Sequence, residues 1–265
     1  MRDFSHEFPA TSDHTYLNTA SCGLLSRTLT TWRHDHDQRL MEGGSMFRDL
    51  HKQHIREIRA TIARFFSTSE SNVALVPNFS FGWNTLLDGL PRDRKVLLLK
   101  GDYPSVNWPV EHRKFNTCYA DIDEHMEQHI AQALETHRPD IFAISVVQYI
   151  SGLKIDLQYL KDLKARFPDT LFVADGTQFL GTEVFDFDES PFDIIGASTY
   201  KWMLAGYGNA FFMIKDSAKQ RIAPIAIGFN SADAKFSKEN DIEFVGRLEP
   251  GHQDTLNYGS IAQSI

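Results

Sequence analysis

The sequence has few cysteines and no surplus of positive charge. Only Cys22 and Cys118 occur among its 265 residues, and they form no CxxC pair, so neither a disulfide framework nor a structural zinc site is indicated. Lysine and arginine number 27 against 35 acidic residues, which gives a formal net charge of −8 and argues against a nucleic-acid partner. Two unpaired cysteines are typical of a protein in the reducing cytoplasm.

Long apolar runs and metal-binding motifs are also missing. No apolar run approaches the roughly 18 residues of a membrane-spanning helix, and the N-terminus lacks the pattern of a signal peptide, so we predict no membrane association. The 11 histidines form no HExxH motif. His34 and His36 alternate with aspartates and are expected on a solvated helix face rather than around a metal. No metal site is predicted.

Short apolar segments alternate with helical patterns along most of the chain. Because the strands are apolar on both faces and helices separate them, the pattern predicts the α/β class, with a mainly parallel sheet between helical layers. Asp156 is placed to cap the last predicted helix. The predicted strands lie in 72–78, 95–101, 140–148, 170–178, 192–199 and 210–215, and the helices in 50–66, 82–90, 123–137 and 156–167.

Ligands of such sheets bind at the carboxyl ends of the strands, where two segments offer candidate binding groups. Asn78, Ser80 and Gly82 enter a helix whose free N–H groups could hold a phosphate. An ordinary helix cap supplied by Ser80 is the alternative, and the spacing alone favours it. Tyr103 could stack on a flat ligand, or it could be a loop aromatic before Pro104.

Asp175 and Lys201 follow two further strands. A buried Asp175 costs several kcal/mol without compensation, which predicts a cationic partner, although a local turn with Gly176 is the alternative. Lys201 lies beside Trp202 and small residues, so we expect a desolvated amine of lowered pKa; a lysine reaching outward to solvent is the alternative. A Schiff-base lysine, an aspartate for a pyridine nitrogen, an anion cradle and a stacking aromatic together meet the requirements of pyridoxal phosphate.

These residues carry a resemblance to a known family. The sequence resembles the class V aminotransferases of the fold-type I pyridoxal-phosphate enzymes, a group that includes cysteine desulfurases, isopenicillin N epimerase-like proteins and kynureninase. The resemblance runs from about Tyr16 to Tyr258, and its most specific part is VADGTQFLG followed by STYKWMLAGYGNAFF. They match the family's D-x-x-Q-x-x-G pattern and the S-x-[HY]-K-W start of its lysine motif, with Asp175 and Lys201 26 positions apart.

The resemblance implies a fold and a role for each matching residue. The implied fold is a three-layer α/β/α large domain with a mainly parallel seven-stranded sheet. Lys201 would hold pyridoxal 5′-phosphate as a Schiff base and move a proton at the substrate's α-carbon, while Asp175 would pair with the ring nitrogen. Gln178 would donate to the ring's 3′ oxygen, Tyr103 would stack on the ring, and Gln148 or Tyr149 would line the site. The implied phosphate ligands are Ser80, the backbone N–H of Phe81, Ser198 and Tyr200, and the implied substrate contacts are Asn18, Ala20 and Ser21.

The resemblance also implies a domain organisation and a partner. Residues 1–25 would lie over the active site, 26–245 would form the cofactor-binding large domain, and 246–265 would begin the connecting helix to a smaller C-terminal domain that the chain does not include. The segment LEPGHQDTLNYGSIA resembles the one through which a partner subunit completes the phosphate site, which implies a homodimer. His252 stands in it where the family often has threonine.

We therefore expect a pyridoxal-phosphate-dependent enzyme that acts on an amino acid, as an aminotransferase or as a lyase, desulfurase or epimerase variant. The alternative is a non-catalytic or truncated protein of the same fold with a binding or assembly role. A nucleotide-binding domain is disfavoured because no phosphate-binding glycine motif follows the first predicted strand.

Overall fold

The computed structural model describes residues 3–231 and 242–265, so part of the predicted large domain, 232–241, lies outside the described residues. All six apolar segments form strands, and a seventh strand, β3, was not predicted from its own sequence. Strand β3 lies at the edge of the sheet, where Asn116 and Tyr119 are exposed. Its sequence therefore does not form the apolar run that is typical of a central strand. The strands are β1 (Val73–Val76), β2 (Lys95–Leu99), β3 (Asn116–Ala120), β4 (Ile141–Ser145), β5 (Leu171–Asp175), β6 (Ile194–Ser198) and β7 (Ala210–Ile214).

The strands form one sheet in the order β1-β7-β6-β5-β4-β2-β3. Strand β7 runs antiparallel to both β1 and β6, and the other pairs are parallel. The prediction of a mainly parallel, seven-stranded sheet is therefore confirmed. Parallel pairing brings the carboxyl ends of β2, β4, β5 and β6 to the same edge.

The predicted helices are present with small shifts at their ends. Asp156 caps the last of them, because its side chain accepts from the backbone N–H groups of Gln158 and Tyr159. The helices are α1 (Ala10–Asp13), α2 (Arg27–Gly43), α3 (Ser45–Arg48), α4 (His51–Phe65), α5 (Phe79–Asp88), α6 (Pro104–His112), α7 (Met126–His137), α8 (Leu157–Arg166), α9 (Asp216–Lys219) and α10 (Thr255–Ser264). None of the helices in the described parts of the chain is long and apolar enough to cross a membrane.

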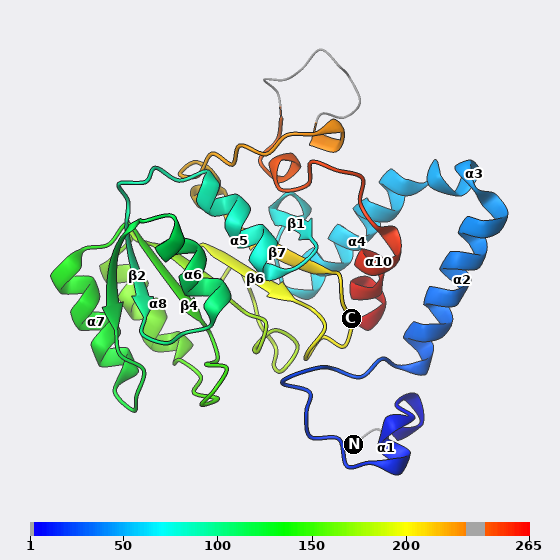
Figure 1. Ribbon diagram of the computed structural model, residues 1–265, viewed down its shortest axis with the longest axis horizontal. Coiled ribbons are helices and arrows are strands. Elements are labelled where there is room, and N and C mark those ends of the chain that lie inside the picture. Colours follow the sequence, from blue (N-terminus) through cyan, green and yellow to red (C-terminus); the bar gives the residue numbers. More distant parts are fainter. Residues whose placement is uncertain (1–2, 232–241) are drawn as a thin grey trace.

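Helices cover both faces of the sheet, as the three-layer prediction requires. One core packs α4, α7, α8 and α10 against strand side chains such as Leu97 and Phe172. The other packs α5, α6 and α9 against alternate side chains such as Leu98 and Val173. Figure 1 shows the sheet between these layers, and α2 at one side of the molecule, away from the parallel strands.

Helix α2 corrects the prediction for His36. His34 is exposed, but His36 is buried, and its Nε2 lies 2.9 Å from Thr255 Oγ1 of α10. The rings of Trp32 and Phe47 pack beside it. Contact with the distant helix α10, which the local sequence does not reveal, places this histidine in the interior.

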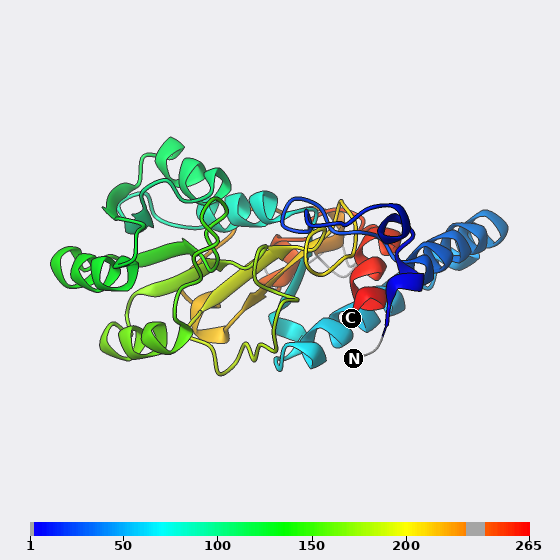
Figure 2. The same cartoon turned by 90° about the horizontal axis from the view of Figure 1, so that it is seen from below.

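The segment before α2 lies against the loop that carries Lys201. Figure 2 shows it alongside the β6–β7 connection. The backbone N–H of Gly23 donates to the Tyr200 carbonyl at 2.8 Å. A Cβ atom at Gly23 would lie 2.1 Å from the Lys201 carbonyl oxygen, so only glycine allows this approach.

A buried carboxylate, Glu249, joins three parts of the fold. Its Oε1 accepts from the backbone N–H of Leu75 in β1 at 2.7 Å, and its Oε2 accepts from Arg59 of α4 and from Gln253. Burial raises the pKa of Glu249, and the Arg59 guanidinium opposes that rise. These bonds tie the segment before α10 to the sheet.

Replacing Glu249 by alanine should destabilise the protein, because it leaves Arg59 and the Leu75 N–H without their partner. We expect Glu249→Ala to lower the free energy of unfolding at pH 7 by about 3 kcal/mol, measured by urea titration. Glu57→Ala, at an exposed position of α4, is the matched control and should change it by less than about 0.5 kcal/mol. Equal effects of the two variants would contradict a structural role for Glu249.

Candidate active site

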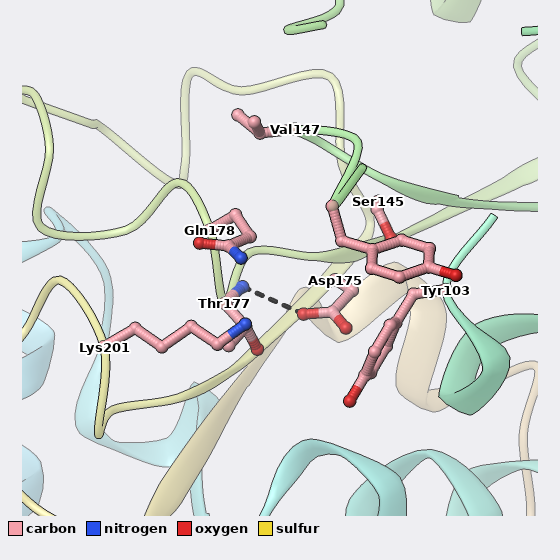
Figure 3. A pocket seen from close by; sticks show the side chains of 8 residues that line it. Tyr103, Ser145, Val147, Asp175, Thr177, Gln178 and Lys201 are labelled. Atoms are coloured by element: carbon pink, nitrogen blue, oxygen red, sulfur yellow. Dashed lines mark hydrogen bonds between the residues drawn. The ribbon is translucent and has the colours of Figure 1, made fainter. Parts of the chain in front are cut away.

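A pocket lies where the strand ends meet. The parallel register places Ser145 of β4 opposite Asp175 of β5, and Asp175 opposite Gly196 of β6. The pocket thereby brings together five residues predicted from the sequence, which are Tyr103, Tyr149, Asp175, Gln178 and Lys201 (Figure 3). Its other lining residues are Ser145, Val147 and Thr177.

Asp175 is buried at the end of β5, with 5% of its surface exposed. Its Oδ1 accepts from the backbone N–H of Thr177 at 2.8 Å. Within residues 3–231 and 242–265, Thr177 is the hydrogen-bond partner of this carboxylate, and no ion pair reaches it. The predicted cationic partner is thus not found in that part of the chain, and the local turn is the observed arrangement. Oδ2 can receive a further donor.

The carboxyl of Asp175 has an unusual pKa. Burial raises the pKa of Asp175 to about 6, the hydrogen bond from Thr177 opposes the rise, and the nearby charge of Asp102 adds to it. The positive charge of Lys201 lowers it slightly. A desolvated carboxylate of this kind favours a cation in front of it.

Lys201 is buried, as its small and aromatic neighbours predicted, with 8% of its surface exposed. Its Nζ lies 6.0 Å from the centre of the Tyr103 ring and 5.6 Å from that of Tyr200. Burial lowers the pKa of the Lys201 amine, and the Asp175 carboxylate opposes that change. In the described part of the chain no carboxylate lies within 4.0 Å of Nζ. A lysine in this setting has a larger share of neutral, nucleophilic amine.

Asp102 and Ser145 were missed by the sequence interpretation. Asp102 is buried, and its carboxylate accepts from the backbone N–H of Tyr103 at 2.6 Å and from that of Ser145 at 2.8 Å. It thus joins the ends of β2 and β4 beside the pocket. The Ser145 hydroxyl is buried without a hydrogen-bond partner among the described residues. The sequence offered one indication that Asp102 lies at the site, because Asp102 directly follows the predicted strand 95–101.

The side chain of Gln178 is held at both ends. Its Nε2 donates to the Ala20 carbonyl at 2.9 Å, and its Oε1 accepts from the indole N–H of Trp202 at 2.8 Å. The Gln148 amide instead donates to the Ser145 carbonyl and does not line the pocket. Of the two alternatives, Tyr149 lines it, with its ring edge-on to that of Tyr103 at 5.2 Å.

Three of the four predicted phosphate ligands, Ser80, Phe81 and Ser198, lie at the start of α5. Ser198 Oγ accepts from the Phe79 N–H at 2.9 Å, and the Ser80 hydroxyl donates to Ser105 at 2.8 Å. The cap of α5 is Asn78 rather than Ser80, because the Asn78 side chain accepts from the Phe81 N–H at 2.9 Å. Both residue types cap helices well, so the sequence alone does not choose between them.

Tyr200, the fourth predicted phosphate ligand, stacks on Tyr207 with ring centres 4.6 Å apart. Burial raises the pKa of Tyr200 to about 12, so its phenol stays protonated and can donate. Asn18 and Ser21 are exposed, and the Ser21 N–H donates to the Asn18 carbonyl in a turn that contains Ala20, whose carbonyl accepts from Gln178. His252 is exposed, with its ring 5.4 Å from that of Phe229.

Comparison with known proteins identifies the family. The family model "Aminotransferase class-V" matches residues 16–248, so the chain belongs to the class V aminotransferase family. A curated relative is the uncharacterised aminotransferase YcbU of Bacillus subtilis (strain 168), which is 24% identical over 245 residues. The match covers 87% of this chain and 65% of YcbU, so this chain spans about two thirds of that relative's length.

Solved structures share the fold at low sequence identity. A mutant of C-DES with glycine covalently linked to its PLP cofactor superimposes with a TM-score of 0.89 and 18% identity, over 99% of this chain and 73% of that one. The apo cysteine desulfurase of Thermococcus onnurineus NA1 gives 0.85 and 16%, over 100% and 70% of the two chains. The predicted fold-type I architecture is confirmed.

Family membership also confirms pyridoxal 5′-phosphate as the cofactor, and the pocket residues fit it. The desolvated Lys201 amine faces the pocket, Asp175 Oδ2 is available for a ring N–H, and the Tyr103 ring offers an aromatic face. A carboxylate desolvated to a pKa of about 6 gains most from a cationic partner such as a protonated ring nitrogen.

The raised pKa of Asp175 predicts a pH-dependent stability of the cofactor-free protein. A carboxyl whose pKa is higher folded than unfolded stabilises the fold below about pH 3.8, and that contribution is lost as the pH rises through about 6. Asp175→Asn should therefore be more stable than the wild type at pH 7.5, by up to about 3 kcal/mol, and nearly equal to it at pH 4. Urea unfolding at the two pH values measures this.

The matched control is Asp193→Asn, which removes the charge of a buried carboxylate paired with Lys164 at 2.6 Å. That variant should be less stable than the wild type at pH 7.5, because it leaves Lys164 without its ionic partner. A loss of stability at pH 7.5 in Asp175→Asn as well would show that the Asp175 charge is compensated and would contradict the prediction.

Proposed function

We propose that this chain uses pyridoxal phosphate to act on an amino acid, with Lys201 holding the cofactor covalently and moving a proton at the substrate's α-carbon. One observation carries the proposal. The Lys201 amine and the Asp175 carboxylate, both desolvated, line one pocket at the carboxyl ends of a parallel sheet. Family membership supports the same chemistry. Aminotransferase, lyase, desulfurase and epimerase reactions all use it, and the proposal covers this class.

When bound, the cofactor supplies an electron sink for negative charge at the substrate's α-carbon. The chain's own residues would maintain that sink. Asp175, oriented by the Thr177 N–H, would hold a proton on the ring nitrogen through Oδ2. Tyr103 would pack against the ring. The Asp102 carboxylate would keep Tyr103 in place by accepting from the Tyr103 backbone N–H. Lys201, with its lowered pKa, would accept and return the α-carbon proton.

The phosphate would be held at the start of α5. The proposed ligands are the hydroxyls of Ser80, Ser198 and Tyr200, together with the Phe81 N–H. Tyr200 stays a donor at neutral pH because its pKa is about 12. Binding through the Phe81 N–H requires the Asn78 side chain to move away, since it occupies that group. The helix dipole adds to the attraction for the phosphate.

The substrate side and the assembly are part of the same proposal. Residues 1–25 would contact the amino acid through Asn18, Ala20 and Ser21, and Ala20 already touches the pocket residue Gln178. Residues 26–245 would be the cofactor-binding domain. Residues 246–265, which contain α10, would begin the connecting helix to a smaller C-terminal domain. A homodimer is proposed from the family resemblance. A cytoplasmic location is proposed from the two free thiols, Cys22 and Cys118.

Covalent labelling tests the role of Lys201. The wild type with added pyridoxal phosphate should turn yellow, and reduction with borohydride should leave a pyridoxyl group on Lys201, found by peptide mapping. Lys201→Ala should lose the adduct and keep some noncovalent binding. The control, Lys215→Ala, removes a partly buried lysine that lies outside the pocket and whose pKa is also lowered by burial; it should keep the label on Lys201. No band, or label spread over surface lysines, would favour the non-catalytic alternative.

The role of Asp175 predicts a separation of turnover from binding. Asp175→Ala should slow exchange of the α-proton of amino acids in D₂O, followed by proton NMR, by roughly 100-fold or more. The dissociation constant of pyridoxal phosphate should rise less, by about tenfold at most, because the phosphate contacts remain. Asp162→Ala, at an exposed position of α8, should match the wild type in both measurements. Unchanged exchange in Asp175→Ala would remove Asp175 from the mechanism.

A further inference from the structure

Trp202 is the residue directly after Lys201, and it reaches back to the loop that follows Asp175. Its indole N–H donates to Oε1 of Gln178 at 2.8 Å, although 37% of the Trp202 surface is exposed. This bond connects the β6–β7 loop, which carries the lysine, with the loop after β5.

The chemistry of the two neighbours fixes the orientation of the Gln178 amide. An indole N–H can only donate, so it must face the amide oxygen. A backbone carbonyl can only accept, so the Ala20 carbonyl, 2.9 Å from Nε2, must face the amide nitrogen. If the amide were rotated by half a turn, its NH₂ group would face the indole N–H and its oxygen would face the Ala20 carbonyl. Only one orientation satisfies both partners.

That orientation directs a donor into the pocket. The amide nitrogen has two N–H groups, and the Ala20 carbonyl takes one of them. Gln178 lines the pocket, and Figure 3 shows its nitrogen on the side of Asp175 and its oxygen turned away. The second N–H is therefore left for a ligand in the pocket. Without Trp202, the Ala20 carbonyl alone would have to hold the amide.

We propose that Trp202 is a positioning residue that fixes the Gln178 amide so that its free N–H donates to an oxygen of the bound cofactor. This inference rests on the proposed function, because it needs the cofactor in the pocket. Trp202 acts through Gln178 and does not itself touch the cofactor. Its effect on the cofactor therefore exists only while Gln178 is present.

The test is a double-mutant cycle with Trp202→Phe, which keeps an aromatic ring and removes the N–H, and Gln178→Met, which keeps the length of the side chain and removes the amide. Trp202→Phe should raise the dissociation constant of pyridoxal phosphate by about 3- to 10-fold. It should also shift the visible absorption maximum of the bound cofactor towards that of Gln178→Met. In the Gln178→Met background, Trp202→Phe should change the dissociation constant by less than about 2-fold.

A control and a cofactor-free measurement complete the test. Trp108→Phe removes an exposed indole of α6 that makes no hydrogen bond in the described parts of the chain, and it should leave affinity and spectrum unchanged. In the cofactor-free protein, the Trp202 indole proton should exchange with solvent more slowly than that of Trp108, measured by NMR. Gln178→Met should abolish this protection.

The outcomes separate this inference from the proposed function. Equal effects of Trp202→Phe with and without Gln178 would show that Trp202 contributes only by packing, and would overturn the inference. So would an unchanged affinity and spectrum in Trp202→Phe when the wild type forms the adduct on Lys201. A wild type without any visible band would overturn the proposed function and this inference with it.

Discussion

The desolvated carboxylate of Asp175 is the constraint on which the pocket depends. It lies at the end of a central strand with one oxygen held by the Thr177 N–H and the other left to the pocket. A second buried carboxylate, that of Asp102, lies nearby, and each of its oxygens accepts from a backbone N–H group. Two buried negative charges and a lining that contains one cationic side chain, Lys201, make the pocket a place for a positively charged group. A protonated pyridine ring meets that requirement.

Local pattern was enough to predict the parts of the fold that are apolar along their whole length. The six apolar segments became strands, and Asp175 and Lys201 emerged at the predicted edge, because in a parallel sheet the end of an apolar run marks that edge. What depended on distant contacts could not be predicted. The burial of His36 comes from Thr255, and the position of Asp102 comes from β2 pairing with β4 and not only with β3.

Three stretches that are far apart in the sequence meet beside the pocket. The N-terminal segment contributes Gly23 and Ala20, the loop after β5 contributes Gln178, and the β6–β7 loop contributes Tyr200 to Trp202. The absence of a side chain at Gly23 lets the first stretch lie on the Lys201 carbonyl. The motifs that carry the family resemblance lie in the last two stretches, which the Trp202–Gln178 bond joins directly, and the first stretch bonds to both of them.

Lys201 reaches the pocket from the connection of an antiparallel pair, whereas Tyr103 and Gln178 follow parallel strands. The ladder that closes this connection pairs Ser198 with Ala210. In β7, Phe211 belongs to one core and Phe212 to the other, and the Phe212 ring fills the space where Gly196 has no side chain. Inserting or deleting one residue in β7 would exchange these two rings between the cores. The register of β7 is therefore fixed by both cores as well as by its pairing with the strand that leads to Lys201.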